Sequence, residues 1–106
     1  MNNKEIEIPT KKLEEMTDED FENIILEFTK DYLKSAQNVS IESDLKEDFH
    51  LTEPQIESFI YFLGDCLENG FDSQYHKKVM ENTTLKNIAK ETKKYLLEDS
   101  LKYSNF

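Results

Sequence analysis

The chain has 106 residues, of which 37% are hydrophobic and 34% are charged, and its net charge is −10. This length predicts one domain, residues 1–106, and the seven Phe and five Tyr exclude a disordered chain. No apolar run approaches the roughly 20 residues of a membrane span, and residues 1–12 lack a signal-peptide core. We therefore expect a cytoplasmic protein. Its single cysteine, Cys66, cannot form an internal disulfide and is expected to be a buried, inert thiol.

The first helix is predicted to follow an N-terminal extension, residues 1–16, which we expect to be flexible and which holds only a weak strand-like alternation at 5–8. Thr17 and Asp20 have the spacing of a capping box, so the helix should begin at Asp18. It should fade near Gln37. Its core-facing positions recur at helical spacing: Phe21, Ile24, Ile25, Phe28, Tyr32 and Leu33.

The second helix has the same start signal, because Thr52 and Gln55 repeat the capping-box spacing. It should run from Glu53 to about Asn69, with Gly70 as the left-handed residue that closes it. Its apolar stripe is the strongest in the chain: Ile56, Phe59, Ile60, Leu63 and Leu67.

Two further helices complete the predicted fold. Asp72 can cap a short helix through about Glu81, and Thr83 or Thr84 should open a last helix that reaches about Leu101. On this last helix, Lys86, Lys90 and Lys94 should line the side opposite the apolar stripe. The fold class is therefore all-α: a small four-helix bundle with three longer helices, one short helix and a long connection from Asn38 to Leu51.

The charge is concentrated in the middle of the chain. Residues 41–72 hold nine acidic residues and one lysine, while residues 73–106 hold four acidic residues and seven lysines. Helical spacing places Glu53, Glu57 and Tyr61 on one outward face of the second helix. We expect a partner-binding surface there and on the preceding loop, and its residues are Glu42, Asp44, Glu47, Asp48, Glu53, Glu57, Tyr61, Asp65 and Glu68. An ordinary solvated helix face is the alternative.

A basic protein is the expected partner, because fixed acidic charge steers positively charged surfaces toward it. Nucleic acid is not expected, since the chain contains no Arg and no strong basic footprint. Catalysis is not expected either. The only two imidazoles, His50 and His76, lack zinc-site spacing, and Asp72 with His76 predicts an exposed ion pair rather than a catalytic dyad. We expect no cofactor and no metal.

From Val39 to Leu96 the chain resembles an acyl carrier protein. The resemblance lies in Ile41, Asp44 and Leu45 after the first helix, in the segment 48–51 before the second, and in the step 82–85 into the last. In that family, a serine at the start of the second helix carries phosphopantetheine. The aligned residues here are Thr52, Glu53 and Pro54, so the resemblance implies a carrier-like fold without the carrier's prosthetic group. A rival alignment on 70–73 would make Ser73 the attachment site, but it leaves too few residues before Thr83 for the family's next helix and loop.

In size, acidity and expected helicity the chain is also similar to bacterial immunity proteins, which plug the basic active site of a toxin or nuclease. Three functions remain open. The first is an inhibitor of this kind, the second is a carrier-like protein that docks on basic partner enzymes, and the third is an adaptor that associates with itself. We rank the inhibitor first because the attachment serine is missing.

Overall fold

The structure is a computed structural model, which describes residues 15–34 and 38–104, with the side chains of 99–104 excepted. In this part of the chain four helices follow one another: α1 (Asp18–Leu33), α2 (Glu53–Leu67), α3 (Ser73–Glu81) and α4 (Leu85–Ser104). The predicted all-α class is confirmed. None of these described helices has the length and apolar character that crossing a membrane requires. The weak strand predicted at 5–8 lies outside the described residues.

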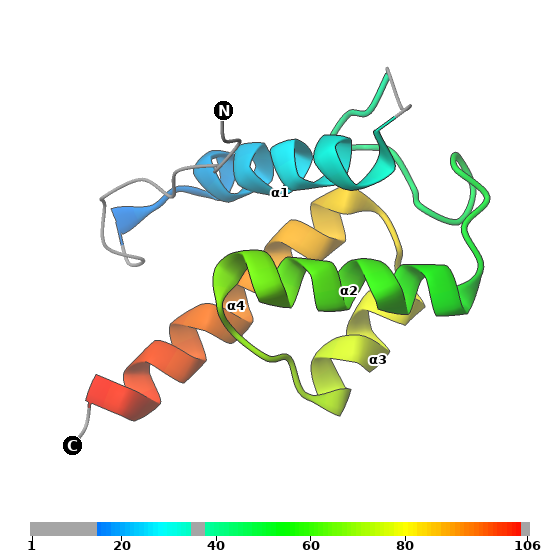
Figure 1. The fold of residues 1–106 in the computed structure, drawn as a ribbon. Helices are drawn as coiled ribbons and strands as arrows, with labels where there is room; N and C mark the ends of the chain where they lie inside the picture. The colour runs from blue at the N-terminus through cyan, green and yellow to red at the C-terminus, as the bar shows by residue number, and fades with distance from the viewer. Residues whose placement is uncertain (1–14, 35–37, 105–106) are drawn as a thin grey trace, which may run out of the picture.

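The helices close a ring of contacts, because α1 packs on α2 and α4, and α3 packs on the same two helices. Figure 1 shows α1 along one side of the molecule and α3 on the other, with α2 and α4 crossing between them. The end of α4 extends beyond the other helices. This arrangement is a small four-helix bundle that encloses one core.

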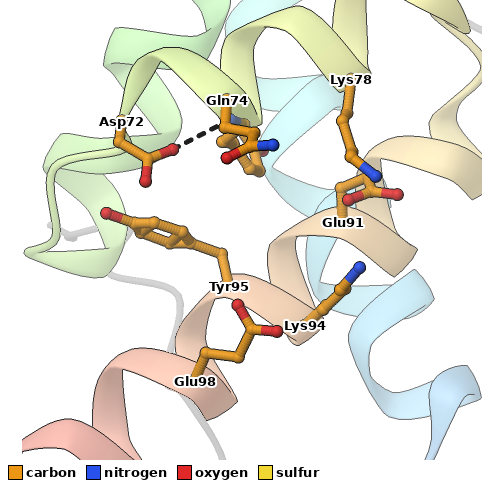
Figure 2. Close-up of a pocket in the computed structure, with 8 residues that line it drawn as sticks. Asp72, Gln74, Lys78, Glu91, Lys94, Tyr95 and Glu98 are labelled. Atoms are coloured by element: carbon orange, nitrogen blue, oxygen red, sulfur yellow. Dashed lines mark hydrogen bonds between the residues drawn. The ribbon is translucent and has the colours of Figure 1, made fainter.

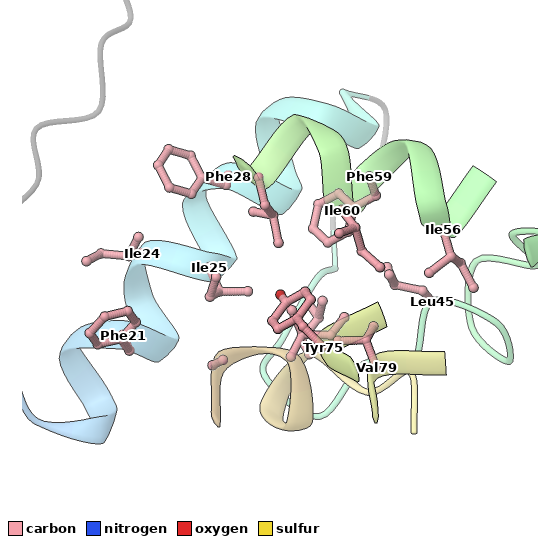
Figure 3. Close-up of a cluster of buried hydrophobic side chains, with 14 of the residues drawn as sticks. Phe21, Ile24, Ile25, Phe28, Leu45, Ile56, Phe59, Ile60, Tyr75 and Val79 are labelled. Atoms are coloured by element: carbon pink, nitrogen blue, oxygen red, sulfur yellow. The ribbon is translucent and has the colours of Figure 1, made fainter. Parts of the chain in front are cut away.

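The core is built from the predicted apolar stripes. Figure 3 shows side chains of α1, α2 and α3 meeting, with Leu45 of the α1–α2 connection among them. Residues at 0% exposure come from every helix and from this connection, and they include Ile25, Leu45, Ile56, Phe59, Ile60, Leu63, Val79, Leu85 and Ile88. Burying an aliphatic or aromatic side chain completely stabilises a fold by about 1.5–3 kcal/mol. Because burial of these side chains fixes the rotation of each helix about its axis, it also determines which residues face solvent.

Helix starts follow the predicted caps. Thr17 and Asp20 form the capping box of α1, and Thr52 and Gln55 form that of α2. Asp72 caps α3 by accepting a hydrogen bond from the amide of Tyr75. The hydroxyl of Thr84 accepts the amide of Asn87, so the second of the two predicted positions opens α4.

Helix ends differ from the predictions. α1 ends at Leu33, before Gln37, and α2 ends at Leu67, before Asn69. The prediction that Gly70 supplies the left-handed residue is wrong. Glu68 adopts that conformation, with φ 54°, and its amide donates to the carbonyl of Asp65. The chain turns here because the core-facing stripe of α2 has ended and α3 must pack back against it. That requirement comes from tertiary packing rather than from the local sequence.

Candidate functional site

The connection between α1 and α2 is held in place by Asp44. Its Oδ1 atom accepts hydrogen bonds from the amides of Lys46 and Glu47 at 2.8 and 3.2 Å, and from the Thr83 hydroxyl at 2.5 Å. An isolated antiparallel bridge joins Asp44 to Thr84, and the Leu45 amide donates to the Thr83 carbonyl at 3.0 Å. Asp44 therefore ties the connection to the start of α4.

The ionisation of Asp44 reflects this structural role. Partial burial of the carboxyl group opposes its charge, but the hydrogen bonds from Thr83, Lys46 and Glu47 outweigh burial and lower the pKa of Asp44 below its ordinary value. A carboxylate whose oxygen already accepts three donors is less available to a partner. We assign Asp44 to the fold first, and its predicted place in binding stays a prediction.

The other acidic residues of this connection face solvent. Glu42, Glu47 and Asp48 are exposed, and Asp48 Oδ2 also accepts the Asp44 amide at 2.7 Å. The one lysine of the acidic segment, Lys46, lies 3.9 Å from Glu53 at the first turn of α2. This pair connects the loop acids to the acidic face of the helix.

α2 carries an outward row of side chains that Glu68 extends at the C-cap, and we call these five residues the acidic ridge: Glu53, Glu57, Tyr61, Asp65 and Glu68. Steps of four residues keep the members from Glu53 to Asp65 on one side of the helix. Tyr61 lies at its centre, between Glu57 and Asp65 one turn away on each side. It is 64% exposed, and among the described residues it is the one exposed large hydrophobic side chain. The structure brings the predicted helix residues of the site together at the surface.

A hollow of about 380 Å³ opens beside Tyr61 at the end of α2. Acidic ridge residues Asp65 and Glu68 line it, together with Phe71 and His76. The His76 ring lies 5.5 Å from the Tyr61 ring, and its Nδ1 atom lies 3.9 Å from a Glu57 oxygen. The hollow therefore combines an apolar wall, an aromatic edge and carboxylates.

His76 does not make the ion pair with Asp72 that its spacing predicted. The Asp72 carboxylate accepts the Tyr75 amide as the cap of α3, while the His76 side chain lies against Glu57 on α2. His76 therefore contacts Glu57 of the neighbouring helix α2 instead of Asp72, which precedes its own helix. His76 was not among the predicted site residues, and four-residue spacing within α3 gave no signal of a neighbour on α2.

Gly64, which lines the hollow beside Tyr61, allows a close approach of the backbone. A β-carbon at this position would lie 2.7 Å from the carbonyl oxygen of Asn69, closer than real contacts allow. The amide of Asn69 donates to the Gly64 carbonyl at 2.9 Å. The missing side chain lets the chain fold back tightly after α2, which shapes the hollow.

The end of α2 is unusually negative for its position in a helix. The last turn contains no basic residue, and Asp65 and Glu68 lie at the end where the helix dipole is itself negative. By contrast, α1 has acidic residues in its first turn and Lys30 in its last, and α3 has Lys78 in its last turn. Asp31 of α1 and Glu81 of α3 also lie in last turns, but a lysine shares each of those turns. Among these three helices, only α2 has acidic residues at its C-terminal end and no basic residue in its last turn.

A different hollow, of about 330 Å³, lies between α3 and α4 (Figure 2). Its lining alternates in sign, with Lys78 and Lys94 near Glu91 and Glu98. The buried Tyr75 hydroxyl is hydrogen-bonded to Thr92 at 2.7 Å. Because both charges are present in similar number, this hollow does not favour a strongly charged partner of either sign.

The sequence also raises the Cys66 thiol, a metal site and Ser73 as possible functional groups. Cys66 is half-buried rather than buried as predicted, and burial, with the charges of Asp31 and Asp65, raises the pKa of its thiol. A raised pKa keeps the thiol protonated and less nucleophilic. Within 15–34 and 38–104, no group of three His, Cys, Asp or Glu side chains could hold a metal ion. Ser73, the alternative attachment site, is the exposed first residue of α3.

Comparisons of the chain with known protein families, with curated proteins and with solved structures found no match. The two resemblances noted from the sequence, to acyl carrier proteins and to immunity proteins, therefore stay predictions.

Proposed function

We propose that this chain is a non-catalytic inhibitor, of the immunity-protein kind, that neutralises a basic toxin or nuclease by binding it through the acidic ridge. The observation that carries the proposal is Tyr61, which is 64% exposed at the centre of a row of carboxylates. An aromatic ring ringed by charge is a frequent binding hot spot, because the ring supplies buried area and the charges supply steering.

The charge at the end of α2 supports the same proposal. An acidic residue at a helix C-terminus costs roughly 0.3–1 kcal/mol relative to a favourable charge there. Asp65 and Glu68 both occupy this end, and no base offsets them within the last turn. A face that only needed to be soluble would be more stable with lysine at these positions. Binding a positively charged partner would recover the cost, since the partner's charge would lie near both carboxylates and the helix end.

The hollow beside Tyr61 suggests how a partner would bind. A lysine or arginine side chain could place its aliphatic part along Phe71 and Tyr61 and its charge near Asp65 and Glu68, which all line the hollow. The carboxylates of the acidic ridge would then occupy the place of the substrate phosphate that a basic active site binds. The partner would then be blocked without any chemistry on this chain.

The experiment is to co-purify the chain with the product of a neighbouring gene and to measure the affinity of the complex for matched variants. Tyr61→Ala should weaken binding by about 2–4 kcal/mol, the range of hot-spot residues. Asp65→Lys should weaken it as well while stabilising α2. Asp31→Lys is the control, because Asp31 occupies the equivalent last turn of α1 but lies off the acidic ridge.

The association rate should also fall steeply with added salt, because steering by exposed charge is screened beyond about 8 Å at physiological ionic strength. If Tyr61→Ala and Asp65→Lys bind as tightly as Asp31→Lys, the acidic ridge is not the interface. If the complex inhibits nothing, the acidic ridge binds but the inhibitor proposal fails.

A carrier-like protein is the second candidate. It is favoured by the order of elements, with a long α1–α2 connection and a short α3 of 9 residues, which the carrier resemblance also implies. At the start of α2, however, the Thr52 hydroxyl accepts the Gln55 amide as the helix cap. Co-expression with a phosphopantetheinyl transferase, followed by intact-mass measurement, separates the two. An adduct would support the carrier function, and an unmodified chain would leave the inhibitor.

A further inference from the structure

A groove of about 440 Å³ runs between the start of α1 and the length of α4. Its floor is apolar and consists of Phe21, Ala89 and Leu97. Phe21 and Ala89 belong to the core, while Leu97 is half-buried toward the end of α4 that extends beyond the other helices. The groove shares no lining residue with the hollow beside Tyr61.

The rim of this groove is rich in lysine. Lys86, Lys90 and Lys94 are exposed along α4, and they line the groove together. A fourth lysine, Lys93, is held at 3.0 Å by Asp18 across the groove end. In a chain of net charge −10, residues 73–106 nevertheless carry seven lysines against four acidic residues. Three acidic residues, Asp18, Glu22 and Glu98, also line the groove. Its lining therefore carries four lysines against three carboxylates, and the row Lys86, Lys90 and Lys94 on α4 is its most basic part.

We propose that this groove binds the acidic ridge of a second copy of the same chain, with Tyr61 entering the groove. Two observations select this occupant. The lysine row of α4 is complementary to the acidic ridge, since Glu57 and Asp65 flank Tyr61 by one turn on each side and Lys86, Lys90 and Lys94 are spaced by one turn along α4. Tyr61 also supplies the exposed ring that an apolar floor of this size can accept.

The geometry makes the contact heterologous, because two different surfaces meet. Each molecule then keeps one unused acidic ridge or one unused groove, so association continues into short chains or closes into a ring. The overall charge of −10 repels copies from one another. We therefore expect a weak, reversible contact that forms at high protein concentration and that becomes stronger when added salt screens the overall repulsion before it screens the close pairs.

Self-association does not require the proposed inhibitor function, but it would compete with it. The second copy covers the same acidic ridge that a basic partner would use. In the self-associated form the acidic ridge would be covered, and a partner that binds it more tightly would shift the equilibrium toward the free monomer.

The test uses two variants that each lose one surface. Lys90→Glu removes a rim charge of the groove and leaves the acidic ridge intact, whereas Tyr61→Ala does the reverse. Lys30→Glu is the matched control, since it changes the net charge equally and alters an exposed lysine of α1 outside both surfaces. Lys86→Glu repeats the groove test one turn away. Thermal melts establish that every variant is folded.

Sedimentation velocity should show wild type and Lys30→Glu growing beyond dimers as concentration rises, while Lys90→Glu and Tyr61→Ala each stay monomeric, with dissociation constants raised about tenfold or more. An equimolar mixture of Lys90→Glu and Tyr61→Ala should form a dimer and nothing larger, because only one intact acidic ridge and one intact groove remain to meet. A wild type that stays monomeric at millimolar concentration would overturn the proposal. So would association of Lys90→Glu equal to that of Lys30→Glu, or a mixture that does not associate.

Discussion

Replacing Asp44 by alanine is expected to destabilise the fold by about 2–3 kcal/mol. The magnitude follows from its contacts: one oxygen accepts two amides and the hydroxyl of Thr83, which is 5% exposed. Hydrogen bonds to a charged group contribute roughly 1.5–3 kcal/mol each. Three of them do not add fully, because Asp44 is only partly buried and water can replace some of what the carboxylate provides.

The Asp44→Asn variant keeps the shape of the side chain and removes its charge. The amide oxygen can occupy the position of Oδ1 and accept the same donors, so we expect a loss of only about 1 kcal/mol. Urea denaturation followed by circular dichroism measures both values, as shifts of the midpoint at unchanged slope. Glu42→Gln is the control, because it removes an exposed charge from the same connection.

The pH dependence gives an independent check. Because the folded pKa of Asp44 is lowered, its contribution to stability is fully present above the ordinary value of 3.8 and is lost as the pH falls below that value. Asp44→Asn cannot titrate, so the stability difference between wild type and this variant should vanish in acid. If Asp44→Ala is as stable as Glu42→Gln at neutral pH, the assignment of Asp44 to the fold is refuted, and its carboxylate would be available to a partner after all.

Three further predictions concern α2 and α3. Tyr61→Ala should change the free energy of unfolding by less than about 0.5 kcal/mol, because the side chain is largely exposed, and a urea titration would reveal any hidden structural role. Gly64→Ala gains about 1 kcal/mol of helix propensity but forces a backbone carbonyl to move from 2.7 Å, so we expect a net loss of about 1–2 kcal/mol in the same titration. A stabilised variant would show that the turn after α2 yields easily. Tyr75→Phe should lose about 1 kcal/mol at neutral pH, since it removes the bond to Thr92. Burial raises the pKa of Tyr75 above its ordinary 10.0, so the folded state holds the proton more tightly and wild-type stability falls as the pH rises above that value. Denaturation at increasing alkaline pH should therefore show a shallower decline for Tyr75→Phe than for wild type.

Helix starts could be predicted from the sequence because each depends on contacts within three residues. The Thr17–Asp20 and Thr52–Gln55 boxes need no information from the rest of the chain. Helix ends could not be predicted to the same accuracy. The residue that turns left-handed after α2 is Glu68, although a glycine stands two positions later, because the return of the chain toward α3 decides where the helix stops.

The acidic ridge could also be predicted, since helical period alone decides which side chains share a face. What could not be predicted is which acidic residues the fold itself uses. Asp44 meets Thr83 across 39 residues of sequence, and His76 meets Glu57 from a different helix. These contacts depend on how α3 and α4 pack, and no local spacing encodes that packing.

The acidic residues of the described chain therefore divide by their physical role. Asp20 and Asp72 cap helices, and Asp44 organises a loop, so each stabilises the fold where it lies. Asp18 and Glu19 occupy the favourable end of the α1 dipole. Asp31 and Glu81 lie at unfavourable helix ends, but Lys30 and Lys78 share those last turns. Asp65 and Glu68 lie at the unfavourable end of α2, where no basic residue in the last turn offsets them. Charge that stability does not explain is where a function should be sought, and in this chain it lies directly beside the exposed Tyr61.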